Sequence, residues 1–394
     1  MAREVVVVSG VRTAIGDYGG SLKDIAPTKL GAIAVKEAVS RAKIDPAAVG
    51  HVVFGSVIHG EARDMYLSRV AAIEGGLPVG TPCLTVNRLC GSGLQAIVSA
   101  SQHILLGDVD VAIGAGTESM SRAAYFIPAA RWGQRMGDAQ LVDAMTGALH
   151  DPFGNGHMGV TAENIAAKYG MTREEQDAFS LESHRRAAKA LDSGHFRSQI
   201  VPVELKSKKG PIRFDTDEHV RKDAKIEDFQ KLKAAFKKEG GTVTAGNASG
   251  INDAAAAVVL MERSAAQKEG AKPLARLVAY AHAGVEPQLM GLGPIPAVRR
   301  VFEKAGLKPA DMDVIESNEA FAVQAMAVTR DLGLDPAKVN PNGGAVALGH
   351  PIGATGCILT VKALYELQRT GKRYALVTMC IGGGQGIAAI FERM

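Results

Sequence analysis

The sequence predicts an α/β protein built from two similar halves. Three observations support this fold class: amphipathic helical segments alternate with short apolar strands, the pattern recurs after 263 residues, and glycine supplies 45 of the 394 residues. Helices that alternate with apolar strands are typical of sheets buried on both faces. We therefore expect layers of helix and sheet, with the two halves packed as pseudo-symmetric partners.

Each half is expected to hold the same order of elements. An amphipathic helix leads into a short strand, and a glycine-flanked turn opens a second helix that is followed by a second strand. In the first half the apolar pattern places these elements around residues 30–38, 52–54, 94–105 and 109–113. In the second half it places them around residues 298–302, 314–315, 358–367 and 374–379. An apolar run at residues 5–8 predicts a further strand before the first of these helices.

The register of the repeat is supported by identical or similar residues. Pairs that fall on each other after a shift of 263 are Ala42 and Ala305, Ile44 and Leu307, Pro46 and Pro309, Ser92 and Thr355, Gly93 and Gly356, Val98 and Val361, and Ala112 and Ala375. The same shift lays His350 on Asn87 and Cys380 on Thr117. The repeat therefore predicts that two equivalent helix N-termini point at one centre.

Residues between the halves differ in character and are interpreted as an insertion. Helices are expected near 161–169 and 173–191, the second opened by a capping box formed by Thr172 and Glu175. The charged stretch 206–239 is either a solvated surface or a positive flank for a phosphorylated ligand. We expect residues 1–120 with 251–272 to form the N-terminal half, 121–250 the inserted loop domain and 273–394 the C-terminal half.

Composition and charge exclude several classes of protein. A net charge of +4 is small for this length, and base-reading motifs are missing, so we expect no nucleic-acid partner. No stretch approaches the roughly 18 apolar residues that cross a bilayer, so no membrane partner is expected. Four cysteines without a CxxC pair predict neither a disulfide framework nor a metal site. With no signal-peptide pattern at the N-terminus, we expect a cytoplasmic protein.

Cys90 is the first candidate for a chemical role. It lies in the sequence Asn-Arg-Leu-Cys-Gly-Ser-Gly, at a turn from extended chain into a helix. The unpaired N–H groups and partial positive charge of a helix N-terminus favour thiolate over thiol, which would activate a nucleophile. A small buried apolar residue is the alternative interpretation of a free cysteine.

Three further motifs hold candidate polar groups. His350 stands in a glycine-rich loop, Gly-His-Pro-Ile-Gly, that runs into the second equivalent helix. Cys380 begins Cys-Ile-Gly-Gly-Gly, which lacks the Lys-Ser/Thr ending of a phosphate-binding P-loop. Asn318 lies in Asn-Glu-Ala-Phe-Ala after an expected strand, where its amide could hold a water or a ligand oxygen. A lone histidine or asparagine is more often structural, but the repeat places His350 at the helix end equivalent to that of Cys90.

These four motifs resemble, in order and spacing, the active-site motifs of the thiolases. The similarity runs nearly the whole length of the chain and is greatest to bacterial biosynthetic-type acetyl-CoA acetyltransferases and broad-range beta-ketothiolases. It implies the thiolase fold, in which two βαβαβαββ halves form five layers, α-β-α-β-α, with an inserted loop domain over coenzyme A. The implied reaction is reversible Claisen condensation of two acyl-CoA molecules to 3-ketoacyl-CoA and CoA.

The resemblance also implies a role for each catalytic residue. Cys90 attacks the thioester while His350 takes its proton, and Cys380 then removes an α-proton from the second acyl-CoA. His350 and a water held by Asn318 stabilise the enolate oxygen. The backbone N–H groups of Cys90 and Gly382 hold the oxygen of the acyl-enzyme.

Further residues match family positions that contact CoA or the acyl chain. They are His157, Met158, Arg221, Ser249, Leu149, Met290 and Phe321. Ser317 and the pair Asn155-Gly156 depart from the family pattern and bear on substrate range. For Met158 the alternative interpretation is a core residue.

The expected partners are acetyl-CoA, other acyl-CoA and CoA, all as substrates, with no separate cofactor and no metal. The resemblance implies a homotetramer. The main interpretation is synthesis or cleavage of acetoacetyl-CoA and 3-ketovaleryl-CoA. The alternatives are a degradative 3-ketoacyl-CoA thiolase with longer substrates, another condensing enzyme of the same superfold, a thiolase-like lipid carrier and a cysteine hydrolase.

Overall fold

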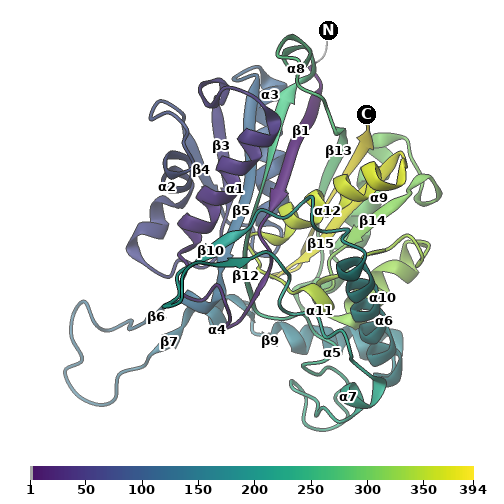
Figure 1. The fold of residues 1–394 in the computed structure, drawn as a ribbon. Helices are drawn as coiled ribbons and strands as arrows, with labels where there is room; N and C mark the ends of the chain where they lie inside the picture. The colour runs from purple at the N-terminus through teal and green to yellow at the C-terminus, as the bar shows by residue number, and fades with distance from the viewer. Residues whose placement is uncertain (1–2) are drawn as a thin grey trace.

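A computed structural model describes residues 3–394 and contains one large mixed sheet with helices on both sides (Figure 1). The strand order is β14-β15-β16-β13-β1-β12-β5-β3-β4, with β2 paired to β12. The strands are β1 (Val5–Arg12), β2 (Gly16–Asp17), β3 (His51–Gly55), β4 (Cys83–Val86), β5 (Val111–Ser119), β12 (Asn252–Glu262), β13 (Ala275–Gly284), β14 (Val314–Ser317), β15 (Tyr374–Ile381) and β16 (Gln385–Arg393).

Helices cover this sheet and form most of the inserted segment. They are α1 (Pro27–Ala42), α2 (Leu67–Glu74), α3 (Ser92–Leu106), α4 (Ala144–Ala148), α5 (Met158–Tyr169), α6 (Arg173–Asp192), α7 (Ile226–Gln230), α8 (Arg263–Lys268), α9 (Pro294–Ala305), α10 (Ala322–Asp331), α11 (Ala345–Leu348) and α12 (Thr355–Thr370). In the part of the chain that the structure describes, no helix is long and apolar enough to cross a membrane.

The sheet consists of two halves joined through β1 and β13. These strands pair over only two residue pairs, Val6 with Arg276 and Val7 with Ala275. Within the halves the pairings are longer: β12 pairs with β5 and β1, and β16 pairs with β13 and β15, all antiparallel. Strand β3 runs parallel to β4 and β5, as β14 does to β15.

Helices lie on opposite faces of each half, which produces the expected five layers. A Cβ atom on Gly31 of α1 would meet Phe54 at 3.0 Å, whereas one on the next strand residue, Gly55, would meet Ser92 of α3 at 2.5 Å. Because successive strand residues point to opposite faces, α1 and α3 flank the sheet. Helix α12 packs on α3 and on β14 and β15, and α9 packs on β13 and β16. Helices α3 and α12 therefore form the central layer.

The structure repeats in the register read from the sequence. Shifting α3, β3 and β5 by 263 residues places them on α12, β14 and β15, and the first residues coincide for all three. Some details differ from expectation: the strand expected at 109–113 begins at Val111, and the helix expected at 161–169 begins at Met158. Strand β4 is matched by helix α11 in the second half, so the segments that lead into α3 and α12 differ in conformation.

Glycine at two equivalent positions lets α3 and α12 touch at their N-termini. A Cβ atom on Gly93 would lie 2.7 Å from the backbone nitrogen of Cys357, and one on Gly356 would lie 2.3 Å from that of Leu94. No side chain fits such a backbone approach. The contact brings the loops that precede both helices, with Cys90 on one and His350 on the other, to the same place.

The inserted segment adds helices and small hairpins on one side of this core. Helix α6 begins with the expected capping box, in which Thr172 and Glu175 exchange hydrogen bonds. Between β6 (Tyr125–Phe126) and β7 (Val142–Asp143) the chain extends far from the body (Figure 1). This projecting hairpin exposes large apolar side chains, namely Tyr125, Phe126, Ile127, Trp132, Met136 and Leu141.

Candidate active site

Cys90 lies in the tight turn between β4 and α3. The motif's polar residues build this turn: the Asn87 side chain accepts from Leu89 N at 2.9 Å, and Ser92 Oγ accepts from Arg88 N and donates to Leu89 O. Leu89 has φ 45°, a left-handed conformation that is strained for a branched side chain. Strain next to a reactive residue is often found at functional sites, and here it belongs to the turn that presents Cys90.

The thiol of Cys90 is partly accessible, yet the protein around it disfavours the thiolate. Burial raises the pKa of Cys90 to about 11, and the charge of Glu118 acts in the same direction. The backbone N–H groups of Gly382 and of Cys90 itself hydrogen-bond the sulfur and lower the pKa by less. The N–H groups thus favour the thiolate, as expected of this turn, but desolvation exceeds their effect. Cys90 needs a base.

Cys380 and Gly382 lie at the hairpin between β15 and β16. Gly383 and Gly384 have φ of 81° and 86°, so the glycine run is required by the turn. A Cβ atom on Gly382 would meet Leu89 at 3.0 Å and the Met158 sulfur at 3.5 Å, which places this hairpin against the Cys90 turn. Cys380 is fully buried, and burial together with nearby Cys90 raises its pKa. Two neutral thiols thus face the same centre.

His350 is held as a neutral imidazole with a defined proton position. Its Nδ1 lies 2.7 Å from Thr355 Oγ1, and that hydroxyl donates its only proton to Pro351 O at 2.9 Å. The hydroxyl must therefore accept from Nδ1–H, which leaves Nε2 with a lone pair. Burial lowers the pKa of His350 to about 4, so the ring is neutral near pH 7. A neutral ring with a free Nε2 can accept a proton.

Asn318 lies directly after β14 and faces His350. Its backbone N–H donates to Thr378 O at 3.0 Å, and its Nδ2 lies 3.4 Å from His350 Nε2. The Asn318 Oδ1 atom is buried and has no hydrogen-bond partner among residues 3–394. An acceptor of this kind is suited to a water or a substrate group.

Three predicted binding residues share one apolar cluster with Cys380. Met158, Met290 and Phe321 are each at least 93% buried and pack in this cluster beside Phe236 and Ala248. Leu149 is half-buried, and its carbonyl oxygen accepts from Met158 N at 2.8 Å. The structure thus brings these residues to the same side of the thiol pair.

His157 and Ser249 approach this cluster from the inserted segment. His157 caps α5 through its Nδ1 atom, which accepts from Gly159 N, and it stacks on Phe236 with ring centroids 4.7 Å apart. The same Phe236 ring meets Phe321 edge to face at 6.2 Å. Ser249 donates its backbone N–H to Ala320 O, next to Phe321.

Arg221 lies apart from the thiol pair. Its side chain is 66% exposed, and it lines a separate cavity of about 590 Å³ with His219 and Lys222. Gly246, three residues before Ser249, and Val346, four residues before His350, line the same cavity. Asp223 and Asp228 line the cavity as well, and Lys222 pairs with Asp192 at 2.7 Å. The exposed Arg221 guanidinium, 3.7 Å from Asp17, is the group suited to a phosphorylated ligand.

Comparison with known proteins identifies the family. Models of the thiolase N-terminal and C-terminal domains match residues 5–264 and 271–393. The chain belongs to the thiolase family. It is 68% identical to beta-ketothiolase BktB of Cupriavidus necator and 51% identical to an acetyl-CoA acetyltransferase of Syntrophomonas wolfei, covering all of both chains each time.

Solved structures agree with this assignment. The human mitochondrial 3-ketoacyl-CoA thiolase matches with a TM-score of 0.98 and 45% identity over all of both chains. A structure of that human thiolase in complex with CoA matches with a TM-score of 0.96 and 44% identity, covering all of this chain and 98% of the other. The five-layered fold predicted from the sequence is therefore the thiolase fold.

Several residues of this thiolase site carry no sequence signal of their own. Glu118, at the end of β5, is fully buried, and its carboxylate accepts from the N–H groups of Val57, Ile58 and Gly353 at 2.9 to 3.1 Å. Burial raises the pKa of Glu118 to about 8. The segments it joins pack on Cys90 through Ile58 and Ile352. Sequence reasoning missed Glu118 because its partners lie 60 to 235 residues away.

The other two cysteines lie outside the site. Cys357 is buried in α12, where its Sγ contacts Gly114 O at 3.7 Å, and Cys83 lies on β4 with Thr81 O near its Sγ. Within residues 3–394, no group of three or more His, Cys, Asp or Glu side chains is arranged to hold a metal ion.

Proposed function

We propose that this thiolase catalyses reversible Claisen condensation of two acyl-CoA molecules through an acyl-Cys90 intermediate. The observation that carries the proposal is the pair of neighbouring thiols, Cys90 and the buried Cys380, beside a histidine whose Nε2 can accept a proton. The relatives named beta-ketothiolase and acetyl-CoA acetyltransferase support acetyl-CoA as one substrate and acetoacetyl-CoA as a product.

The first half-reaction transfers an acyl group to the enzyme. His350 Nε2 accepts the Cys90 proton as the sulfur attacks the thioester carbonyl, and the tetrahedral intermediate expels CoA, which takes a proton from Cys380. We assign the oxygen of this intermediate to the N–H groups of Cys90 and Gly382, because both act on the Cys90 sulfur in the resting enzyme. Such a donor typically contributes about 3 kcal/mol to lowering the barrier.

The second half-reaction forms the carbon-carbon bond. Cys380 as thiolate removes an α-proton from a second acyl-CoA, and the enolate carbon attacks acyl-Cys90, releasing 3-ketoacyl-CoA and the Cys90 sulfur. The enolate oxygen requires donors, which we assign to His350, whose Nε2 still carries the Cys90 proton, and to a water held by Asn318. Cys380 enters this step as a thiolate because it has given its proton to CoA, and burial, which raises its pKa, makes that thiolate a strong base. The released Cys90 sulfur takes its proton back from His350.

CoA is proposed to lie across the inserted segment. The cavity at Arg221 suits the nucleotide, while His157, Ser249 and Leu149 adjoin the apolar cluster of Met158, Met290 and Phe321 through Phe236, Ala320 and Met158. That cluster suits the pantetheine and acyl chain because its surface is apolar and adjoins Cys380. CoA thioesters are substrates, and no separate cofactor is proposed.

The deciding experiment measures thiolysis of 3-ketoacyl-CoA substrates of four, five and more carbons. We expect the C4 and C5 substrates to be cleaved, with Cys90→Ser abolishing the reaction. Cys380→Ser should still form acyl-enzyme from acetyl-CoA while condensation fails. Full thiolysis by Cys90→Ser would refute the assignment. Preference for long chains alone would instead favour the alternative of a degradative 3-ketoacyl-CoA thiolase.

The assembly and location are proposals as well. The projecting hairpin exposes Trp132 to 89% and Met136 to 84%, and apolar side chains gathered on an extended segment are typical of a subunit contact. We propose a homotetramer in which this hairpin reaches a neighbouring copy, to be tested by light scattering. A monomer would refute it. Four free cysteines fit a cytoplasmic protein.

A further inference from the structure

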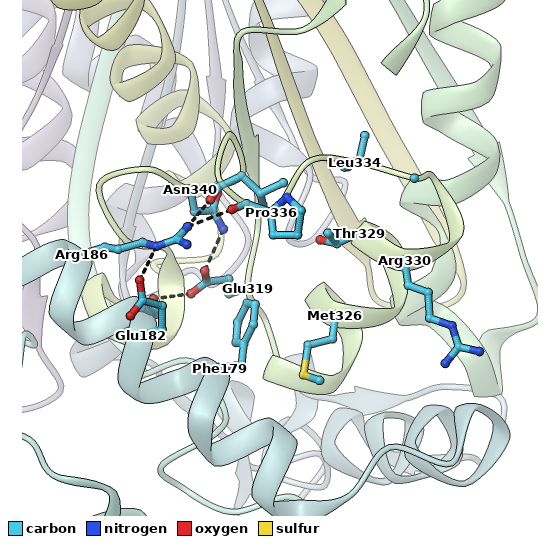
Figure 2. Close-up of a pocket in the computed structure, with 13 residues that line it drawn as sticks. Phe179, Glu182, Arg186, Glu319, Met326, Thr329, Arg330, Leu334, Pro336 and Asn340 are labelled. Carbon is cyan, nitrogen blue, oxygen red and sulfur yellow. Dashed lines mark hydrogen bonds and ion pairs between the residues drawn. The ribbon is translucent and has the colours of Figure 1, made fainter. Parts of the chain in front are cut away.

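Asn340 lies in the loop between α10 and α11, and its side chain points toward Glu319, the residue after Asn318 (Figure 2). It has φ 44°, a left-handed conformation that asparagine tolerates better than most residues. Its side chain is 2% exposed, and its backbone N–H donates to Ile315 O at 2.7 Å. The residue is therefore held in place by its own backbone.

The Asn340 amide makes three hydrogen bonds to the two residues that flank Asn318. Its Oδ1 accepts from Ser317 N at 3.0 Å, and its Nδ2 donates to Ser317 O at 2.8 Å and to Glu319 Oε1 at 2.8 Å. The Ser317 hydroxyl is buried without a partner among the described residues, so Asn340 bonds Ser317 only through its backbone. The Asn340 side chain thus binds both neighbours of Asn318, and we call Asn340 and Glu319 together the bracket.

Glu319 extends this bracket to two other segments of the site. Its Oε2 accepts from Ser183 Oγ of α6 at 2.7 Å and from Val346 N of α11 at 3.2 Å. Helix α11 leads directly to His350. A Cβ atom on Gly344 would come within 2.1 Å of the carboxyl group, so glycine is needed there to admit it. The pair joins the Asn318 strand, the His350 loop and the inserted segment.

The Asn318 side chain has little else to orient it. Its Nδ2 has one contact, the 3.4 Å approach to His350, and its Oδ1 has no partner within residues 3–394. A donor or acceptor that stabilises a transition state must be preorganised, because small displacements cost much of its effect. The orientation of Asn318 must therefore come from its backbone, which Asn340 and Glu319 hold.

We infer that Asn340 and Glu319 are positioning residues that set the orientation of Asn318 for the enolate step. This inference rests on the proposed function, in which Asn318 acts only when an enolate forms. Acyl transfer between CoA and Cys90 uses Cys90, His350 and the N–H of Gly382 instead. Loss of the bracket should therefore slow carbon-carbon bond chemistry while acyl transfer continues.

The experiment compares two reactions of purified enzyme carrying Asn340→Gly, which keeps the left-handed backbone and deletes the amide. Thiolysis of acetoacetyl-CoA passes through the enolate, whereas exchange of labelled CoA into acetyl-CoA does not. We expect kcat for thiolysis to fall at least tenfold, with exchange and the KM for acetoacetyl-CoA each changing less than threefold. Equal loss in both reactions, or no loss in either, would overturn the inference.

A matched control and a second variant complete the design. Asn342, two residues along the same loop, bonds Glu366 and His195 instead, so Asn342→Ala should leave the ratio of the two rates unchanged. Glu319→Gln keeps the volume but turns one acceptor into a donor, and should lower the ratio in the same direction. If both Asn340→Gly and Glu319→Gln fail to fold, the pair maintains the fold and the inference is refuted.

The failure of the inference is distinguishable from failure of the proposed function. If wild-type enzyme shows neither thiolysis nor exchange, the function is wrong. If wild type shows both and the variants keep its ratio, only the positioning role is wrong.

The bracket forms the inner wall of a cavity of about 590 Å³ lined by Phe179, Met326 and Leu334, so neither variant forces atoms into packed space (Figure 2).

Discussion

Replacing Thr355 by valine tests how the protein keeps His350 ready to accept a proton. Thr355 is 1% exposed, and its hydroxyl is the acceptor for His350 Nδ1–H. Valine has nearly the same shape but no acceptor. The Nδ1 proton would then be buried without a partner, or would move to Nε2, where it blocks the lone pair that takes the Cys90 proton.

The expected loss follows from the geometry. Leaving a buried donor unsatisfied costs about 1–3 kcal/mol. In Thr355→Val this cost falls on the tautomer with the proton on Nδ1, and it therefore favours the tautomer with the proton on Nε2. A change of about 2 kcal/mol in the barrier corresponds to roughly a thirtyfold change in rate. We therefore expect the rate of Cys90 acylation by acetyl-CoA to fall about thirtyfold in Thr355→Val.

Thr355→Ser is the matched control because it keeps both hydrogen bonds of the hydroxyl. Its acylation rate should stay within threefold of wild type. Single-turnover acylation, followed by mass spectrometry of the acyl-enzyme, measures the step directly, and thermal unfolding of both variants checks that they are folded. An acylation rate for folded Thr355→Val equal to that of Thr355→Ser would refute the assigned proton position.

Two further predictions concern the thiol and the glycine contact. In His350→Ala, iodoacetamide should alkylate Cys90 at a rate that rises about tenfold per pH unit from pH 7 to 10. The reason is that the pKa of Cys90 in the folded protein is about 11, so the thiolate fraction grows as the pH approaches that value. An alkylation rate that reaches a plateau below pH 8 would contradict this prediction. Gly356→Ala should lower the free energy of unfolding by about 1–3 kcal/mol or more, because the new Cβ would lie 2.3 Å from Leu94 N. The cost of this clash outweighs the roughly 1 kcal/mol that alanine gains over glycine in a helix. Gly80→Ala is the control, because a Cβ atom at Gly80 would meet no atom within 4 Å, and it should change the free energy of unfolding by less than about 0.5 kcal/mol. Urea denaturation measures both variants, and equal effects of the two substitutions would refute the close contact at Gly356.

Elements with strong local patterns were predicted well. The capping box at Thr172 and the helices α3 and α12 lie where apolar periodicity placed them, because local propensity and burial agree there. Boundaries were less exact: the strand after α3 begins two residues later than expected, at Val111. The assignment of residues 121–250 as one inserted domain stays a prediction.

The supporting residues of the site could not be found from the sequence. Glu118, Asn340 and Phe236 act through partners that the fold brings from distant segments, and an isolated glutamate, asparagine or phenylalanine has no pattern. Phe236 lies in the charged stretch that was interpreted as a solvated surface or a positive flank, yet it stacks on His157 and contacts Phe321. The net pKa of Cys90 could not be predicted for a related reason, since desolvation depends on everything packed around the sulfur.

By itself, the sequence determined the α/β class, the 263-residue repeat, the family motifs and the residues that can do chemistry, because these depend on composition and short-range order. Only the tertiary structure decided the relative positions and the protonation states of those residues. The abutting glycines Gly93 and Gly356 set where Cys90 and His350 meet, Thr355 sets the proton on His350, and burial sets the thiol state of Cys90. Each effect depends on distances between segments far apart in the chain and on the exclusion of water between them.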